Sequence, residues 1–232
     1  MNLPNPLIKG RLIRRYKRFL ADIQLGNEEI ITVHCPNSGS MLGCSAPGSP
    51  VLLSTSPNPK RKYSRTLEMV LSDRVWVGIN TALTNHLVRE ALEARRIKEF
   101  SALDAIRPEI KTSVNTRLDF LLQQQGKKIY LEVKNCSLAE NGAAMFPDAI
   151  TTRGTKHLQE LAGLRAQGHK AAVLFCVQRG DADHFRPAAH IDRVYADTLD
   201  EVAGAGVMVL AYQADVSPRG IAIARPLPVR MG

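Results

Sequence analysis

The pattern of apolar residues changes near Asn80, and this change restricts the possible folds more than any other feature. Before Asn80, short runs that alternate apolar and polar residues predict β-strands, separated by turns rich in proline, serine, asparagine and glycine. The predicted strands cover residues 19–25, 30–33, 51–54, 67–71 and 74–79. Five short strands fit a small β-barrel, and OB-like and SH3-like barrels are equally compatible with this pattern.

After Asn80, which is a suitable helix N-cap, apolar residues recur at helical spacing. Leu83, Leu87 and Ala91 predict a helix that continues to about Arg96. Strands are then expected at residues 116–123, 128–135, 171–177 and 207–212, with a helix at about 152–168. The alternation of helices and strands predicts an α/β fold. We therefore expect two domains, a β-barrel over residues 1–80 and an α/β domain over residues 81–232.

A further short helix is expected near the end of the α/β domain. Thr198 and Glu201 have the spacing of a capping box, in which the first residue caps the helix and the second bonds back to it. The pattern places the start of this helix at Thr198.

Two neighbouring strands of the α/β domain carry the residues that point to chemistry. Glu132 and Lys134 are two positions apart, so they project from the same face of a strand. The residues 125–126 between the two strands, Gln-Gly, suit a two-residue hairpin turn, and counting outward from this turn places Asp119 opposite Glu132. A slip of one residue in this register would separate the two carboxylates.

Two close carboxylates repel each other unless a cation neutralises them, and hard oxygen ligands suit Mg²⁺ or Mn²⁺. Asp119 and Glu132 are therefore predicted as metal ligands. Lys134 is predicted to orient water and to stabilise charge on a phosphate oxygen, so the three residues together predict phosphodiester hydrolysis. Alternating charges on an exposed strand explain an E-x-K pattern equally simply. Glu90, on the first predicted helix, is a further candidate acid for the site, with a solvated helix charge as the alternative.

Positive charge is concentrated in a few clusters. Lysine and arginine outnumber the acidic residues by 31 to 22, a formal net charge of +9 that favours polyanionic partners. Arg153, Lys156 and His157 are spaced to form one basic patch near a helix N-terminus, which favours phosphate, although a solvated stripe beside Glu160 is an equal alternative. The predicted nucleic-acid-binding residues are Arg11, Arg14, Arg15, Lys17, Arg18, Lys60, Arg61, Lys62, Arg153 and Lys156.

The chain lacks the marks of a membrane or secreted protein. Its four cysteines form no C-x-x-C pair and are predicted to be reduced thiols. No apolar run approaches the roughly 18 residues needed to span a bilayer, and the N-terminus has no hydrophobic signal segment. We expect a cytoplasmic protein that makes no contact with membranes.

Several sequence blocks, in their order along the chain, resemble the sugar fermentation stimulation protein A family. The blocks are residues 35–41, 117–120, 132–135, 146–149 and 152–158. The resemblance implies an OB-like domain followed by a restriction-endonuclease-like α/β domain of the PD-(D/E)xK type with a mixed sheet, DNA binding, and a link to regulation of sugar (maltose) utilisation genes. Leu118 replaces the proline of that motif, and Pro147-Asp148 follows the E-x-K strand and cannot take its place.

Three functions are compatible with these features. The first is a DNA-binding protein with a nuclease-like site that uses Mg²⁺ or Mn²⁺ and acts on single-stranded or non-specific DNA. The second is a non-catalytic, DNA-binding transcriptional regulator, because a retained fold and acidic residues do not prove turnover. The third is a protein-interaction module without affinity for DNA.

Overall fold

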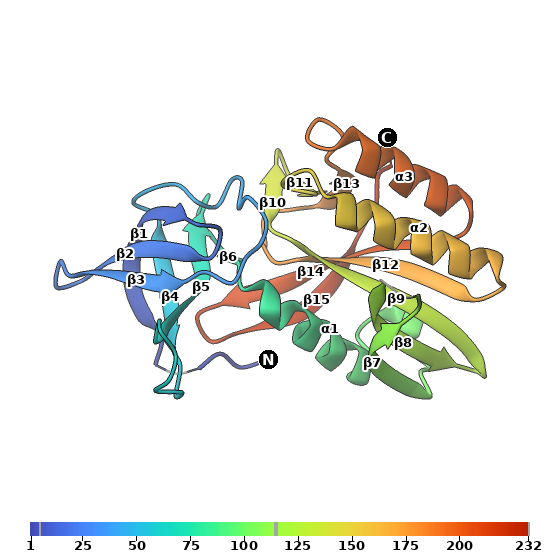
Figure 1. Ribbon diagram of the computed structural model, residues 1–232, viewed down its shortest axis with the longest axis horizontal. Helices are drawn as coiled ribbons and strands as arrows, with labels where there is room; N and C mark the ends of the chain where they lie inside the picture. Colours follow the sequence, from blue (N-terminus) through green and yellow to red (C-terminus); the bar gives the residue numbers. More distant parts are fainter. Residues whose placement is uncertain (5, 114–115, 232) are drawn as a thin grey trace.

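The N-terminal part of the computed structural model is a closed β-barrel (Figure 1). The structure describes residues 1–4, 6–113 and 116–231. The strands have the order β3-β2-β1-β4-β5-β6, and a parallel pairing of β3 with β5 closes the first five into an OB-like barrel. Their bounds are β1 (Ile8–Tyr16), β2 (Leu20–Leu25), β3 (Ile30–His34), β4 (Pro50–Thr55), β5 (Arg65–Ser72) and β6 (Val75–Gly78). The barrel prediction is confirmed.

Strand β1 was not expected from the sequence, although it is the longest strand of the barrel among the described residues. Basic side chains occupy several of its exposed positions, and only Leu12 is buried. This leaves no clear apolar alternation to recognise. The pairing of β1 with both β2 and β4 makes it a central strand all the same.

The second part is an α/β layer structure built on a mixed sheet of order β15-β14-β12-β9-β8-β7. Strands β9, β12 and β14 are parallel, and the outer pairings are antiparallel. The strands are β7 (Ala105–Lys111), β8 (Arg117–Gln124), β9 (Lys127–Cys136), β12 (Lys170–Val177), β14 (Met208–Ser217) and β15 (Gly220–Leu227). A small second sheet contains β10 (Leu138–Glu140), β11 (Ala143–Phe146) and β13 (His184–Pro187). The predicted α/β class with a mixed sheet is confirmed.

Helices cover both faces of this sheet (Figure 1). Helix α1 (Thr84–Glu93), preceded by the 3-10 turn η1 (Thr81–Leu83), packs against one face, and η2 (Lys98–Phe100) follows it. Helices α2 (Thr152–Ala166) and α3 (Arg193–Gly204) pack against the other. Each face has its own apolar cluster: Leu131 and Val133 of β9 face α1, whereas Val173 and Phe175 of β12 face α2 and α3. Alternating residues of the central strands therefore supply both cores.

The start of α3 differs from the expectation. Asp192 is its N-cap, accepting a hydrogen bond from the backbone N–H of Tyr195, so the helix begins five positions before Thr198 at Arg193. Thr198 lies within the helix and donates its hydroxyl to the Val194 carbonyl. The capping-box spacing was wrong here because Asp192, six residues earlier, caps the helix with its carboxylate.

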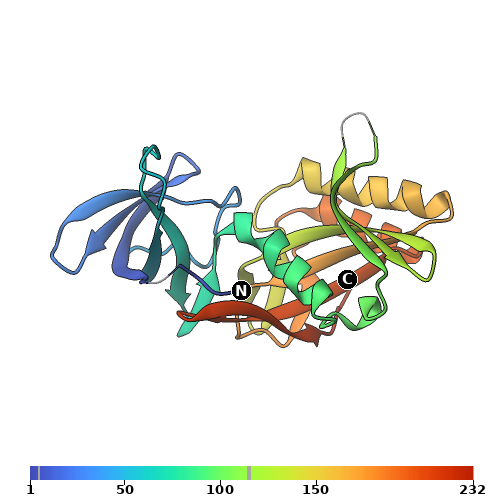
Figure 2. The ribbon, with the colours of Figure 1, turned by 90° about the horizontal axis from the view of Figure 1, so that it is seen from below.

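The first residues of the chain, which precede the barrel strands, contact the α/β part. Met1 and Asn2 pair with β15 of the α/β part (Figure 2). The Met1 amino group lies 2.8 Å from Glu90 of α1. The division at residue 80 stays a prediction, because these first residues pack against the second part. In the part of the chain that the structure describes, no helix is long and apolar enough to cross a membrane.

Candidate functional site

The hairpin of β8 and β9 has the predicted register. Gln125 and Gly126 form its two-residue turn with left-handed φ angles of 52° and 73°, the geometry of a primed turn. Gln124 pairs with Lys127, and the ladder runs to the pair formed by residues 120 and 131. Counting one position further places Asp119 opposite Glu132. The backbone ladder ends before this pair, and the Asp119 carboxylate accepts a hydrogen bond from the Val133 N–H.

Asp119 is held by one backbone and one side-chain donor. Its carboxylate accepts hydrogen bonds from the Val133 N–H at 2.8 Å and from Asn85 Nδ2 of α1 at 2.7 Å. Burial, and then the negative charge of Glu132, raise the pKa of Asp119 to about 6, against the opposing effect of these two hydrogen bonds. The carboxylate is thus fixed in place, but the positive charge of Lys134 offsets its burial and the repulsion from Glu132 only in part.

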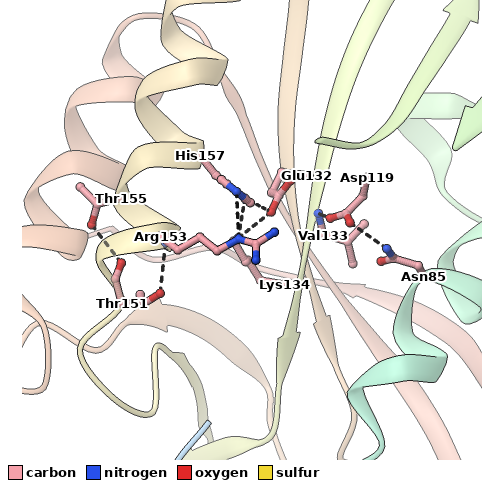
Figure 3. Close-up of polar contacts among 10 residues, drawn as sticks. Asn85, Asp119, Glu132, Val133, Lys134, Thr151, Arg153, Thr155 and His157 are labelled. Atoms are coloured by element: carbon pink, nitrogen blue, oxygen red, sulfur yellow. Dashed lines mark hydrogen bonds and ion pairs between the residues drawn. The ribbon is translucent and has the colours of Figure 1, made fainter. Parts of the chain in front are cut away.

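Glu132 lies on the other side of β9, facing α2 (Figure 3). It is only 3% exposed, and its Oε1 accepts from Lys134 Nζ at 2.6 Å and contacts His157 Nδ1. Burial opposes its ionisation, but the hydrogen bond with His157 and the charge of Lys134 outweigh burial and lower the pKa of Glu132. Glu132 therefore loses its proton at a lower pH than Asp119 does.

The second oxygen of Glu132 has no partner. Glu132 Oε2 is buried and accepts no hydrogen bond from the described residues. A buried carboxylate oxygen without a donor costs free energy, and a cation bound to it would remove that cost and would also reduce the effect of the Glu132 charge on Asp119. The two acids therefore fit a hard divalent ion, although no group of three His, Cys, Asp or Glu side chains among the described residues is arranged as a ready metal cage.

His157 was expected to form one basic patch with Arg153 and Lys156; it lines the same cleft as they do, but its side chain is buried. It is 7% exposed and inserts between α2 and β9, where it contacts both Glu132 and Lys134. Arg153, one helical turn earlier, donates from Nε to His157 Nε2 at 3.4 Å. The spacing of these residues on α2 was visible in the sequence, but which helix face packs on the sheet was not.

The candidate acid of the first helix also differs from the expectation. Glu90 is bound to the Met1 amino group, well along α1 from the site. Asn85, in the first turn of α1, is the residue that reaches Asp119. Asn85 is a neutral amide, so it carries no charge that would mark it as a site residue in the sequence.

The basic residues of β1 have different interaction partners. The Arg15 guanidinium donates to the backbone carbonyls of Arg18, Asn37, Gly39 and Ser40, so it holds the 37–40 loop, contrary to the expectation that it faces a phosphate. Arg14 pairs with Asp22 at 2.8 Å and lies over the Tyr16 ring. Arg11 donates to the Gly48 carbonyl but stays exposed.

Two barrel loops bring predicted cations to one end of the barrel. Lys17 and Arg18, both exposed, form the turn between β1 and β2 with left-handed φ angles of 47° and 62°. Arg61, in the loop between β4 and β5 with Lys60 and Lys62, contacts His34 Nδ1 at 3.2 Å. His34 pairs with the first residue of β2, directly after the turn, so the loops meet. These are the two loops by which OB-folds commonly bind oligonucleotides.

Two open clefts lie beside the N-terminus of α2. The first, of about 470 Å³, lies between the barrel and the α/β part and reaches Arg18 and Arg153. The second, of about 710 Å³, is lined by Lys111, Thr116, Arg117, Arg153, Lys156 and His157, among others. Both share Arg153, so they adjoin, and the second ends at His157 over Glu132. Cations thus line a path from the barrel to the acidic residues.

Comparison with known proteins agrees with this architecture. Residues 13–79 match the family model described as the SfsA N-terminal OB domain, and residues 82–220 match the sugar fermentation stimulation protein RE domain. A sugar fermentation stimulation protein homolog of Desulfotalea psychrophila is 52% identical over 96% of this chain and 94% of its own. The homolog of Geotalea uraniireducens is 52% identical over the full length of both chains.

A solved structure has the same fold over nearly the whole chain. The structure of Pyrococcus furiosus SfsA in complex with Ca²⁺ superposes with a TM-score of 0.90 at 25% identity, covering 99% of this chain and 98% of that one. Both domains are therefore shared, in the same arrangement. By its sequence and its fold, this chain belongs to the sugar fermentation stimulation protein family.

Proposed function

We propose that the protein binds DNA and carries a divalent-metal site for phosphodiester hydrolysis at Asp119, Glu132 and Lys134. The observation that carries this proposal is the buried, partnerless Glu132 Oε2, level with a second carboxylate and beneath a cleft lined by cations. An acidic pair of this kind is costly in a protein without a cation and is useful for polarising a phosphate.

The chain's own residues have distinct roles in this proposal. Asp119 and Glu132 would hold Mg²⁺ or Mn²⁺, which when bound supplies Lewis-acid chemistry at a phosphate oxygen. Lys134 Nζ, held between Glu132 and His157, lies where an ammonium can orient a water molecule and stabilise developing negative charge. The Pyrococcus furiosus relative, a Ca²⁺ complex, supports a divalent ion in this family without identifying the ion used here.

DNA binding is supported by basic side chains that form no ion pair with an acidic residue in the described part of the chain. Among the described residues, Lys17, Arg18, Lys60, Arg153 and Lys156 form no ion pair with an acidic side chain. They lie on the two barrel loops and beside the two clefts, so one strand of phosphates can follow them to the acidic pair. Contacts of this kind bind DNA with little sequence preference and with a strong dependence on salt.

The binding test is a titration of labelled single-stranded and duplex DNA at several salt concentrations. Each phosphate contact contributes about −0.9 to the slope of log K against log salt on duplex DNA. Lys60→Ala should weaken binding to all sequences alike and reduce that slope by about 1, whereas Lys170→Ala, an exposed lysine outside both clefts, should change neither. Affinity that does not vary with salt would contradict the proposal and favour a protein-interaction module.

The site test is a metal titration by calorimetry together with a cleavage assay in Mg²⁺ and in Mn²⁺. Asp119→Ala should abolish metal binding and cleavage, whereas Asp215→Ala, an exposed carboxylate on β14, should leave both intact. Metal binding that survives Asp119→Ala would place the site elsewhere. Salt-dependent DNA binding and metal binding without cleavage would favour the second function, a DNA-binding regulator of sugar utilisation, which agrees with the name of the family.

A further inference from the structure

Three sequence blocks that take no part in the Asp119–Glu132–Lys134 cluster meet at one cavity. The first cleft, of about 470 Å³, is lined by residues 37–39, 146–149 and 152–153 of these blocks, among others. The blocks come from the barrel, from the end of β11 and from the start of α2, so they are far apart in the sequence. The packing of the two parts of the molecule brings them together, and the metal chemistry does not explain this arrangement.

The walls of this cavity are held firmly by contacts between the two parts. The Asp148 carboxylate accepts a hydrogen bond from the Met41 N–H at 2.8 Å, and Ser40 Oγ donates to the Asp148 carbonyl. A side chain at Gly39 would place its Cβ 2.6 Å from the Asp148 carboxylate, so that carboxylate would have to move away from its place beside the loop. Arg15 holds the same loop from the other side through its carbonyls. The cavity is therefore preformed.

The charge inside the cavity suits a phosphate. Arg18 of the barrel and Arg153 of α2 line it, and neither is paired with an acidic side chain among the described residues. The amides of Thr152 and Arg153 belong to the first helical turn, where they have no acceptor within the helix. Asp148 is the one acidic residue of the described lining, and its carboxylate is directed to the Met41 amide.

The rest of the lining suits a nucleobase. Phe146, Pro147 and Ile150 supply apolar surface, and Ile150 is 78% exposed, so a base that covers it would remove apolar area from water. A volume of about 470 Å³ lies within the range of roughly 300–1,000 Å³ for small-molecule sites. A double helix is far too wide to enter such a cavity, whereas one nucleotide is not.

We propose that this cavity holds a single unstacked nucleotide of single-stranded DNA, with its phosphate against Arg18 and Arg153 and its base against Pro147 and Ile150. The proposal rests on the DNA binding proposed above and specifies its substrate: a single strand or an unpaired strand end. Because the cavity shares Arg153 with the second cleft, a strand anchored here continues towards His157 and Glu132.

The test fills the cavity without changing its charge. Ser38 is an exposed residue of the lining, and Ser38→Trp would occupy the space of the base. Affinities for single-stranded and duplex DNA of equal length are measured by fluorescence anisotropy. The single strand also carries 2-aminopurine, whose fluorescence rises when the base leaves its stack. Arg18→Ala removes the phosphate contact, and Arg219→Ala, an exposed arginine outside both clefts, is the matched control.

The native protein should increase 2-aminopurine fluorescence on binding. Ser38→Trp should weaken single-strand binding by about tenfold, with the duplex affinity changed by no more than about twofold. Arg18→Ala should weaken single-strand binding by about tenfold and duplex binding by less, and Arg219→Ala should behave as the native protein. A folded Ser38→Trp variant with unchanged single-strand affinity and fluorescence would overturn the proposal while leaving the DNA-binding function in place. If Ser38→Trp fails to fold, an unchanged Arg18→Ala variant overturns it. Absence of all DNA binding would overturn both.

Discussion

Replacing Asp119 by asparagine should stabilise the metal-free protein and at the same time remove its stabilisation by metal. Burial and the charge of Glu132 raise the pKa of Asp119 from 3.8 to about 6. At 1.36 kcal/mol per pH unit, the ionised carboxylate opposes folding by about 3 kcal/mol at pH 8, as an upper bound. Asparagine keeps one acceptor and loses one of the hydrogen bonds from Val133 and Asn85, which costs about 1 kcal/mol. The expected net gain is about 2 kcal/mol.

The gain should depend on pH in a defined direction. Between pH 4 and 6 the folded protein keeps a proton on Asp119 that the unfolded chain releases, so the penalty of the native carboxylate disappears as the pH falls. Urea denaturation at pH 8, 6 and 4.5 with a chelator present should therefore show a stabilisation that shrinks with falling pH. At pH 8 the melting temperature should rise by about 4–8 °C.

Two controls make this prediction decisive. Asp215→Asn, at an exposed position, should change neither stability nor metal binding. With saturating Mg²⁺ or Mn²⁺ the native protein should gain about 3 kcal/mol, as expected at a hundred times the dissociation constant, and the Asp119→Asn variant should gain nothing. An equal loss of stability at pH 8 and pH 4.5 would refute the electrostatic reasoning, and metal stabilisation of the variant would refute the ligand role.

Three further predictions concern the residues around this site and the barrel loop. Lys134→Ala should abolish cleavage while metal affinity, measured by calorimetry, is retained, because an ammonium is not a ligand; normal cleavage would exclude its role. His157→Phe should destabilise the protein by about 1–3 kcal/mol in urea denaturation at pH 7, since Glu132 loses a buried partner, and unchanged stability would show that this contact is not needed. Arg15→Lys should destabilise by about 1–3 kcal/mol, because one ammonium cannot reach the carbonyls that the guanidinium joins; an unchanged melting temperature would contradict this.

Local patterns in the sequence were sufficient for the class of each domain and for the hairpin of the site. Alternation of apolar residues predicted β2 to β6, and the apolar run predicted the buried strand β12. The Gln-Gly turn predicted that Gln124 pairs with Lys127, as the structure has it. Counting outward from this pair places Asp119 opposite Glu132. These features depend on residues close in the chain, whose geometry is set by turn type and by the two-residue period of a strand.

Features that depend on distant segments could not be predicted in this way. Strand β1 is recognised by its partners on both sides, since only Leu12 of its own side chains is buried. Whether His157 faces solvent or Glu132 depends on how α2 is rotated on the sheet, and a spacing of three and four residues describes either face. The choice of Asn85 over Glu90 as the neighbour of Asp119 depends equally on where α1 crosses β9.

The sequence by itself thus determined a barrel, an α/β domain and two carboxylates level with each other on adjacent strands, because each of these follows from local backbone geometry. Only the tertiary structure decided that the carboxylates lie on opposite sides of β9, that Arg15 holds a loop, and that three separate sequence blocks enclose one cavity between the domains. The physical reason is that these relations depend on the packing of helices and of the barrel against the sheet. That packing depends on side chains from many segments of the chain, so it cannot be predicted from any short stretch of sequence.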